Sequence, residues 1–368
     1  MLLSPFRPPR ALGRSTNRSR VDHSTGTLIR THEFLYPSRM PRADAFLTGA
    51  GFSRAVSSSM PLTADLGSVV ARQLADRGFD TSLLRQLYHG DFEAWLTHLA
   101  EGRPWATEAD NLRARAMFLD GARLVGEVID SAQRRALQRA AWLSRLVSWW
   151  HDNGSTVISL NYDTLIEQTV EDLSLRSADH IVHYSSTYAV PISSASLRRS
   201  ATLAGEEVDT FRLLKLHGSI NWFYSGADAP HGETVYDGGL LKGRNAWRKL
   251  IAETKGLDLL VDKVPYVVPL TGTKSSFFNN ETIRAQWEVA SRFCRAAPRL
   301  VVMGYSLPES DQLMRLFIQE SVRHQQITLV NLDPNTPKHF GRLLPEFDID
   351  DTWVGSPNPI ERFVDSLE

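Results

Sequence analysis

Six short apolar runs, each ending at a glycine, an asparagine or a turn, place the strongest constraint on how this chain folds. Nearly continuous apolar character over so few residues is typical of parallel strands, which are buried on both faces. Helical patterns at Leu165–Leu173, Thr282–Ala296 and Ser310–His324 separate several of the runs. The alternation predicts an α/β fold with a doubly wound, mostly parallel, Rossmann-like sheet of about six strands. The expected strands are Ala45–Thr48, Thr156–Leu160, Arg212–Leu216, Tyr266–Leu270, Leu300–Gly304 and Ile327–Leu332.

The long interval between the first two runs interrupts this rhythm. From Leu66 to His151 the apolar residues recur at helical spacing and almost no strand pattern is present. We therefore expect residues 66–151 to form a helical insertion that covers a cleft, with residues 341–368 as a C-terminal segment. The tryptophans of the insertion are expected to pack in its core rather than to form a ligand cage. They are Trp95, Trp105, Trp142, Trp149 and Trp150.

The first 39 residues differ in composition from the rest. They are rich in Arg, Ser, Pro and Thr, with Asp22 and Glu33 as their acidic residues. This composition is typical of a disordered or targeting segment. Alternatively, translation begins at Met40, and residues 1–39 are an extension that the native protein lacks.

Overall composition narrows the classes of partner. The chain has 41 Lys and Arg against 42 Asp and Glu, so its net charge of -1 gives no reason to expect nucleic-acid binding. No apolar run approaches the roughly 20 residues that span a bilayer. We expect a soluble, cytoplasmic protein without direct nucleic-acid or membrane binding. The single cysteine, Cys294, excludes an internal disulfide framework and a four-thiolate zinc site within one chain, and we expect no metal.

A glycine loop follows the first expected strand. Glycines at Gly49 and Gly51, with Ala50 between them, allow the backbone to approach a pyrophosphate, and Ser53 and Arg54 offer a hydroxyl and a cation. The loop is neither a phosphate-binding NTPase signature nor a full dehydrogenase fingerprint. The alternative is a tight turn without a ligand.

Polar residues also follow the second and third expected strands. Asn161 and Asp163 come directly after one strand, and His217 with Gly218 ends the other. Taken singly, the first pair could cap a helix and the histidine could be structural. Because the carboxyl ends of parallel strands meet at one edge of a sheet, we expect these groups and the glycine loop to face one ligand.

In this order and spacing, the motifs resemble the sirtuin superfamily, and particularly its bacterial sirtuin-like NAD hydrolase branch found in anti-phage defence. The resemblance covers most of residues 43 to about 334 outside the insertion, so residues 40–65 and 152–340 are expected to form a sirtuin-like NAD-binding domain. The motifs are Thr48–Ser53, Met60-Pro61, Asn161–Asp163, Lys215–Trp222, Pro269 with Lys274, and Gly304–Asp311.

The resemblance implies NAD as the substrate, bound in two halves. Gly49, Ala50, Gly51 and Ser53 would hold the pyrophosphate through backbone amides and a hydroxyl. Gly304, Ser306, Asn331 and Asp333 would face the adenosine half, although Asp333 could instead form an Asp-Pro turn.

The catalytic roles concern the bond between nicotinamide and ribose. His217 would act as general base toward a ribose hydroxyl or the attacking water, since imidazole has an ordinary pKa of about 6.5. Asn161 would orient the water and the ribose, and Asp163 would recognise the nicotinamide carboxamide or hold the loop. The products would be nicotinamide and ADP-ribose.

Two departures separate the chain from deacetylating sirtuins. It lacks their two cysteine pairs for zinc, and Ser59–Thr63 stands where those enzymes carry Gly-Ile-Pro-Asp-Phe-Arg. An NAD-dependent protein deacylase and a non-catalytic NAD or ADP-ribose binding module remain the alternatives. A free NAD hydrolase would be toxic, so we expect restraint by the insertion, by homo-oligomerisation or by an activating partner protein.

Overall fold

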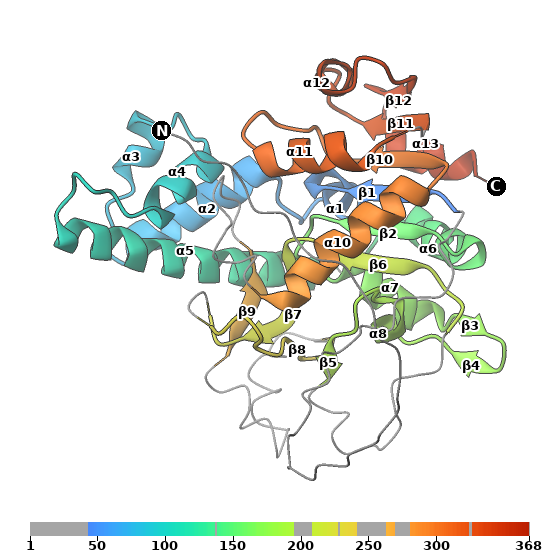
Figure 1. Cartoon of the computed structure of the whole chain (residues 1–368), viewed down its shortest axis with the longest axis horizontal. Helices are drawn as coiled ribbons and strands as arrows, with labels where there is room; N and C mark the ends of the chain where they lie inside the picture. Colours follow the sequence, from blue (N-terminus) through green and yellow to red (C-terminus); the bar gives the residue numbers. More distant parts are fainter. Residues whose placement is uncertain are drawn as a thin grey trace, which may run out of the picture. The chain divides into compact units, whose positions relative to one another are not determined.

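A six-stranded, all-parallel sheet lies at the centre of the computed structural model (Figure 1). The strand order is β12-β11-β10-β1-β2-β6. Counted along the chain, this is the 3-2-1-4-5-6 order of doubly wound dinucleotide-binding folds, so the predicted fold class is confirmed. The strands are β1 (Ala45–Thr48), β2 (Thr156–Ser159), β6 (Arg212–Lys215), β10 (Arg299–Met303), β11 (Gln326–Asn331) and β12 (Ile349–Val354).

The structure describes residues 43–136, 138–194, 208–226, 229–240, 263–268, 280–323 and 326–367. The expectations for residues 1–39, and those for Pro269 and Lys274, lie outside these ranges.

One strand predicted from the sequence was assigned to the wrong sheet. The run at Tyr266–Leu270 begins within β9 (Val264–Val267), which pairs antiparallel with β7 (Gly218–Tyr224) in a separate sheet of order β5-β8-β7-β9. The sixth parallel strand is instead β12, which the apolar pattern did not indicate because this edge strand is only partly buried and contains Asp350 and Asp351. The other short strands are β3 (Arg176–Ser177), β4 (His180–Ile181), β5 (Ser193–Ser194) and β8 (Tyr236–Asp237).

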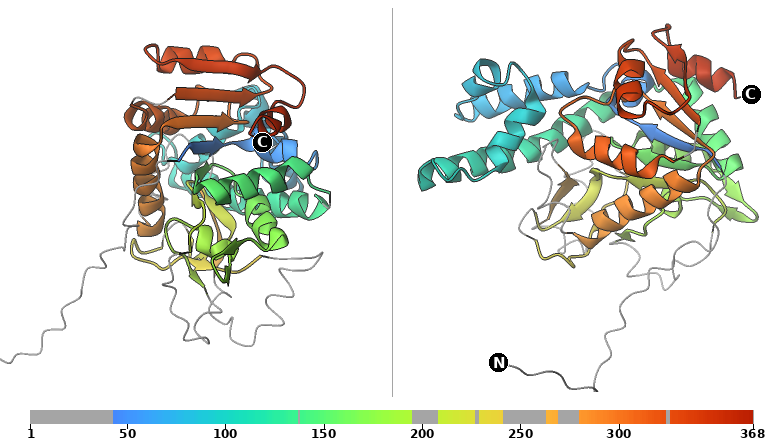
Figure 2. Two further views of the ribbon diagram at one scale, coloured as in Figure 1. Left: turned by 90° about the vertical axis from the view of Figure 1, so that its right-hand side faces the viewer. Right: turned by 45° about the horizontal axis from the view of Figure 1, so that its top comes forward.

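Helices cover both faces of the parallel sheet (Figure 2). Successive residues of a strand point to opposite faces, so Phe46 packs in one core cluster while Ala45 and Leu47 pack in the other. The first cluster contains residues of α1 (Ala50–Val56), α6 (Ala141–Asn153), α7 (Leu165–Leu173) and α13 (Pro359–Asp365). The second contains residues of α10 (Glu281–Ala296), α11 (Gln312–Ser321) and α12 (Thr336–Leu343). A short helix, α8 (Tyr184–Thr187), lies between β4 and β5.

The interval predicted to be helical holds no strand among its described residues. It contains α2 (Thr63–Asp76), α3 (Ser82–Gln86), α4 (Phe92–Ala100), α5 (Glu108–Arg135) and α6. Helices α2 and α4 pack on α5, and α6 returns the chain to the sheet at β2. The exact domain boundaries remain a prediction.

The tryptophans of this interval divide into two groups. Trp95, Trp142 and Trp150 are buried as expected and Trp149 packs at the edge of the same core, whereas Trp105 is 83% exposed. Trp150 contacts the rings of Phe46, Phe52 and Phe211, at centroid distances of 5.5, 6.2 and 5.8 Å. It therefore joins α6 to the first strand and to the helix that follows it.

Within the described ranges, no helix is both long enough and apolar enough to cross a bilayer.

Replacing Trp150 by alanine should destabilise the fold by about 3–5 kcal/mol, because it empties a fully buried aromatic site. Trp105→Ala removes the same side chain from an exposed position and should change stability by no more than about 0.5 kcal/mol. Urea unfolding of both variants measures the difference. Equal losses of stability would contradict the assigned packing.

Candidate functional site

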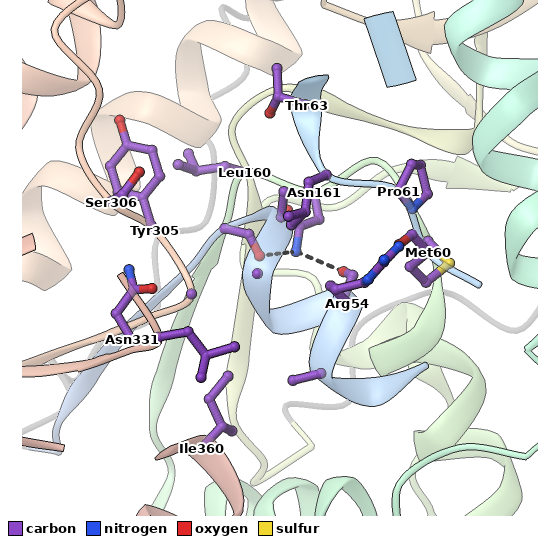
Figure 3. Close-up of a pocket in the computed structure, with 18 of the residues that line it drawn as sticks. Arg54, Met60, Pro61, Thr63, Leu160, Asn161, Tyr305, Ser306, Asn331 and Ile360 are labelled. Carbon is purple, nitrogen blue, oxygen red and sulfur yellow. Dashed lines mark hydrogen bonds between the residues drawn. The ribbon is translucent and has the colours of Figure 1, made fainter. Parts of the chain in front are cut away.

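A cavity of about 890 Å³ lies at the carboxyl edge of the parallel sheet. Every site residue predicted from the sequence lines it, although these residues come from strand ends far apart in the chain. They are Gly49, Ala50, Gly51, Ser53, Asn161, Asp163, His217, Gly304, Ser306, Asn331 and Asp333. Figure 3 shows part of this lining, with Asn161 between Tyr305 and Ser306 on one side and Arg54, Met60 and Pro61 on the other.

The cavity forms where the winding of the sheet changes direction. Strands β1 and β10 are neighbours, but α1 packs on one face of the sheet and α11 on the other. The segments that follow the two strands therefore diverge and leave a crevice at their ends, which is where open α/β sheets bind ligands.

Glycines allow the two turns at this point to touch. The backbone N–H of Gly51 donates to the carbonyl of Gly304 at 2.9 Å, and the N–H of Gly49 donates to that of Met303 at 3.0 Å. Gly304 has a φ of +61°, and a Cβ there would overlap the backbone of Gly51 and the amide of Phe52. Only glycine combines that conformation with so close an approach.

These contacts change the predicted role of the glycine loop. The amides of Gly49 and Gly51, expected to hold a pyrophosphate, already donate within the protein. The two glycines therefore allow close packing at the crevice, and their amides are not available to donate to a ligand. Arg54 lines the same wall, where its guanidinium donates to the carbonyl of Met60 at 2.8 Å and lies 3.7 Å from the Asp65 carboxylate.

Asn161 links two strand ends. Its side-chain amide donates to the carbonyl of Gly49 and to the hydroxyl of Ser53, both at 2.8 Å (Figure 3). Because a carbonyl can only accept, the contact with Gly49 fixes which end of the carboxamide is the nitrogen. Both amide hydrogens are committed to the protein, and the carboxamide oxygen is the group that can accept from a ligand.

Asp163 receives hydrogen bonds from two sides. Its carboxylate accepts from the Ser53 hydroxyl at 2.6 Å and from the backbone N–H of Leu165 at 3.2 Å. Its own carbonyl accepts from the ammonium group of Lys215, which also pairs with the buried Glu167 carboxylate at 3.0 Å. Burial raises the pKa of Glu167, and the Lys215 cation opposes that shift. The buried pair thus supports the loop that carries Asn161 and Asp163.

His217 lies in the wall of the cavity and is 1% exposed. Its ring is 6.3 Å from that of Tyr162 and 6.1 Å from that of Trp287, measured between centroids. The following residue, Gly218, has a φ of +78° at the start of β7, and a Cβ there would overlap the Tyr266 carbonyl. Glycine at this position lets the chain turn from β6 into the smaller sheet immediately after the histidine.

The rest of the His217 motif serves the smaller sheet. Asn221 is buried, and its amide donates to the Asp237 carboxylate at 3.1 Å and to the Tyr188 hydroxyl at 3.2 Å. The Ser219 hydroxyl donates to the Asn221 side chain at 2.6 Å. None of these side chains lines the cavity, so this part of the motif is a scaffold for the histidine.

The ends of β10 and β11 line the opposite side. Asn331 is 8% exposed, and its side-chain nitrogen has no hydrogen-bond partner among the described residues. The Asp333 carboxylate accepts from the backbone N–H of Asn335 at 2.9 Å, as in the turn that was the alternative interpretation, yet the residue also lines the cavity. The carbonyl of Ser306 contacts the His339 ring at 2.9 Å.

The structure adds residues that sequence reasoning missed. Glu93 of α4, Ile129 of α5 and Trp142 of α6 bring the insertion to the cavity, and Ile360 and Glu361 bring α13. No local pattern identifies these residues, because each reaches the site through tertiary packing. Asp311, by contrast, ends a motif that the resemblance had already singled out.

In the described part of the chain, no group of three or more His, Cys, Asp or Glu side chains could hold a metal ion. The expectation that the protein uses no metal remains a prediction.

Comparisons with known proteins give structural likenesses. One is a SIR2 structure in complex with the inhibitor EX-527, 2′-O-acetyl-ADP-ribose and deacetylated p53 peptide, with 13% identity, a TM-score of 0.37, and coverage of 89% of this chain and 92% of that one. Another comes from work on the structural basis of sirtuin substrate affinity, with 13% identity, a TM-score of 0.39, and coverage of 89% and 94%. No protein-family model and no curated protein matches the sequence.

Gly304→Ala should destabilise the protein by at least about 3 kcal/mol, because the added methyl group meets backbone atoms of Gly51 and Phe52. Gly341→Ala is the matched control, since this helical glycine of α12 has open space around it and should gain about 0.5–1 kcal/mol. Thermal and urea unfolding compare the two. A stable Gly304→Ala protein would refute the packing described for the crevice.

Lys215→Met should destabilise the protein by about 3–5 kcal/mol at neutral pH, because Glu167 loses its buried cation. The Glu167 pKa is already raised in the folded state, so the folded protein binds the extra proton and unfolding free energy falls as pH rises above the ordinary carboxyl value. Lys215 opposes the rise in the Glu167 pKa, so that pKa is higher still in the variant. The loss of stability should therefore be larger at about pH 8 than at about pH 5. The exposed Lys338→Met variant, followed by urea unfolding at both values, should show neither effect.

Proposed function

We propose that this chain is an NAD glycohydrolase, which cleaves the bond between nicotinamide and ribose and releases nicotinamide and ADP-ribose. One observation carries the proposal: a glycine turn, the amide of Asn161 and the imidazole of His217, each identified separately at a different strand end, line one cavity at the switch point of the sheet. The cavity volume of about 890 Å³ lies within the range of about 300–1,000 Å³ that is usual for ligand sites.

The lining fits a dinucleotide in three ways. The glycines of the turns after β1 and β10 place no side chain of their own in the crevice, and the guanidinium of Arg54 offers a cation on the same wall. The buried side-chain nitrogen of Asn331 needs an acceptor, which the adenosine half would supply. Asp333 lines the cavity as an acceptor for ribose hydroxyls.

Cleavage develops positive charge on the ribose as nicotinamide leaves. His217 would take a proton from a ribose hydroxyl or from the attacking water, and the free carboxamide oxygen of Asn161 would orient that water. The buried ring of Tyr162 and the partly buried ring of Trp287 flank the imidazole of His217. Catalysis would then rest on position and on electrostatics.

Of the two roles considered for Asp163, the hydrogen bonds favour holding the loop. Both of its carboxylate oxygens accept from the protein, one from Ser53 and the other from Leu165. The carboxylate thereby orients the Ser53 hydroxyl, which in turn accepts from Asn161. Asp163 is then a positioning residue.

The biological setting of the hydrolase and the control of its activity are proposed from the sequence resemblance alone. Anti-phage defence is the setting that the resemblance implies, and an activating partner or self-association would restrain a toxic hydrolase. The insertion supports the idea of restraint because it contributes part of the cavity wall.

His217→Ala and Asn161→Ala should each lower nicotinamide release by at least about 100-fold in protein that remains folded, as circular dichroism checks. Their controls are His231→Ala and Asn153→Ala, which change the same residue types outside the cavity and should retain activity. Purified proteins are incubated with NAD, with and without candidate triggers, and the products are separated chromatographically.

Three results would redirect the proposal. Normal turnover by both cavity variants would refute the assigned chemistry. Stimulation of nicotinamide release by an acetylated peptide would favour a deacylase. Intact NAD with every trigger, despite measurable binding, would favour a non-catalytic module.

A further inference from the structure

Large apolar side chains gather on an exposed side of the insertion. Trp105, Leu112 and Leu119 are 83%, 63% and 41% exposed, and they lie along the first half of α5 or just before it. This half of α5 lies away from the parallel sheet (Figure 1). A single exposed apolar residue is ordinary, but several neighbours on one element indicate a surface that contacts another protein.

The turn that carries Trp105 is fixed against α5. The carboxamide of Asn111, in the first turn of the helix, accepts from the backbone N–H of Arg103 and donates to its carbonyl, both at 3.1 Å. The Arg103 guanidinium also contacts the His98 ring of α4 at 3.2 Å. Because this turn is already ordered, its exposed tryptophan loses little conformational freedom on binding, and tryptophan is prominent among the residues that dominate protein interfaces.

The exposed residues of α5 recur at the spacing of a coiled coil. Ala109, Leu112, Ala116 and Leu119 follow one another at intervals of three, four and three residues, and all four are exposed. The buried residues of the helix lie on its other side, where α2 and α4 pack. We call these four exposed residues the α5 seam. Its alternation of small and large side chains allows a second helix to pack closely on it.

A second copy of the seam fits the first when the two helices run in opposite directions. Antiparallel pairing about a two-fold axis places Leu112 opposite Ala116 of the second copy and Leu119 opposite its Ala109, so every layer joins a large side chain to a small one. Parallel pairing would place leucine opposite leucine and alanine opposite alanine. Wide and narrow layers would then alternate along the helices and pack poorly.

Charges at the two ends of the seam favour the same arrangement. Glu108 lies exposed at one end, and Arg123, whose side chain is 47% exposed, lies four residues beyond Leu119 at the other. Antiparallel pairing brings Glu108 of each copy beside Arg123 of the other. Within its own helix Arg123 donates to Asp120 at 2.9 Å and to Glu127 at 2.8 Å. Its guanidinium has five N–H donors and can bind a further carboxylate.

Two neighbouring residues agree with this pairing. Trp105 precedes Glu108 at the same end of the seam, so the guanidinium of Arg123 from the second copy can also rest on its indole ring. Arg113 lies near the middle, where the two-fold axis brings like residues together. It pairs with Asp110 of its own helix at 3.1 Å, which offsets the repulsion between the two copies.

We propose that the α5 seam, with Trp105, Glu108 and Arg123 at its ends, is the surface through which two copies of this chain form an antiparallel, two-fold symmetric dimer. The contact involves half of one helix from each copy, so the buried area falls at the low end of specific interfaces and the dimer is reversible. None of the seam residues lines the cavity, and the inference does not depend on NAD cleavage.

Sedimentation of the full-length protein tests the surface. Native protein should convert from monomer to dimer as its concentration rises over about 1–100 µM. Leu119→Glu should raise the dissociation constant of the dimer at least about tenfold, because it places a charge opposite Ala109 and beside Glu108 of the second copy. Leu316→Glu is the matched control, since this leucine of α11 is 54% exposed outside the insertion, and should leave the constant within about twofold.

Two charge reversals test the ends of the interface. Glu108→Arg and Arg123→Glu should each weaken the dimer about five- to tenfold, because each brings like charges together. The double variant has opposite charges across the interface again, so its dissociation constant should return to within about threefold of the native value. If the reversals acted only by disturbing α5 itself, their effects would add in the double variant.

Cysteine cross-linking tests the direction of the helices. The chain has one cysteine, Cys294, which is 1% exposed, so introduced surface cysteines can be followed separately. A mixture of Ala109→Cys and Leu119→Cys proteins should form a disulfide between copies under mild oxidation. Neither protein alone should do so, because antiparallel pairing separates the two copies of either residue by about 15 Å along the helices, beyond the reach of a disulfide.

The outcomes decide the proposal separately from the proposed function. Native protein that stays monomeric over this range would overturn it, as would folded Leu119→Glu protein that dimerises like the native one. A double charge variant weaker than both single variants would also overturn it. Cross-linking of Ala109→Cys protein alone as rapidly as in the mixture would refute the antiparallel arrangement. Since these measurements use no NAD, their failure leaves the proposed cleavage of NAD untouched.

Discussion

The contact between two glycine turns at the ends of β1 and β10 is the constraint on which the site depends. Parallel strands that send their following segments to opposite faces leave a crevice, but side chains at the turns would fill it. Here the amide of Gly51 meets the carbonyl of Gly304, and neither residue places a Cβ between the strands. The backbone of the two turns therefore borders the crevice directly. Asn161 lies at its edge, where the side-chain amide donates to the Gly49 carbonyl.

A buried polar network extends from this rim into the smaller sheet. It explains why the segment after His217 carries serine and asparagine at fully buried positions, where apolar residues would be the rule. Each group is satisfied by the next, which makes such a network specific in geometry. The Glu167 carboxylate joins the two halves, because it contacts both the Lys215 ammonium and the Tyr188 hydroxyl. In order, the members are Tyr184, Asp237, Asn221, Tyr188, Glu167, Lys215, Asp163, Ser53 and Asn161.

Two additions to the doubly wound sheet close the cavity. The insertion packs Trp150 against the first strand and brings Glu93 to the cavity wall, where its carboxylate accepts a hydrogen bond from Ser310. The C-terminal helix α13 follows the edge strand β12 and lines another part of the wall through Ile360. Both additions therefore contribute to the lining of a pocket whose other walls come from the ends of the parallel strands.

The sequence by itself determined the sheet's class and the residues at its carboxyl edge. A parallel strand that is buried on both faces appears in the sequence as a continuous apolar run. The polar residues and glycines of the turn that follows the strand come directly after that run. What the runs did not reveal was pairing: the run at Tyr266 joins the smaller sheet, and partly exposed β12, with Asp350 and Asp351, completes the larger one. Strand partners and the approach of Glu93 depend on contacts between distant segments, so only the tertiary structure decided them.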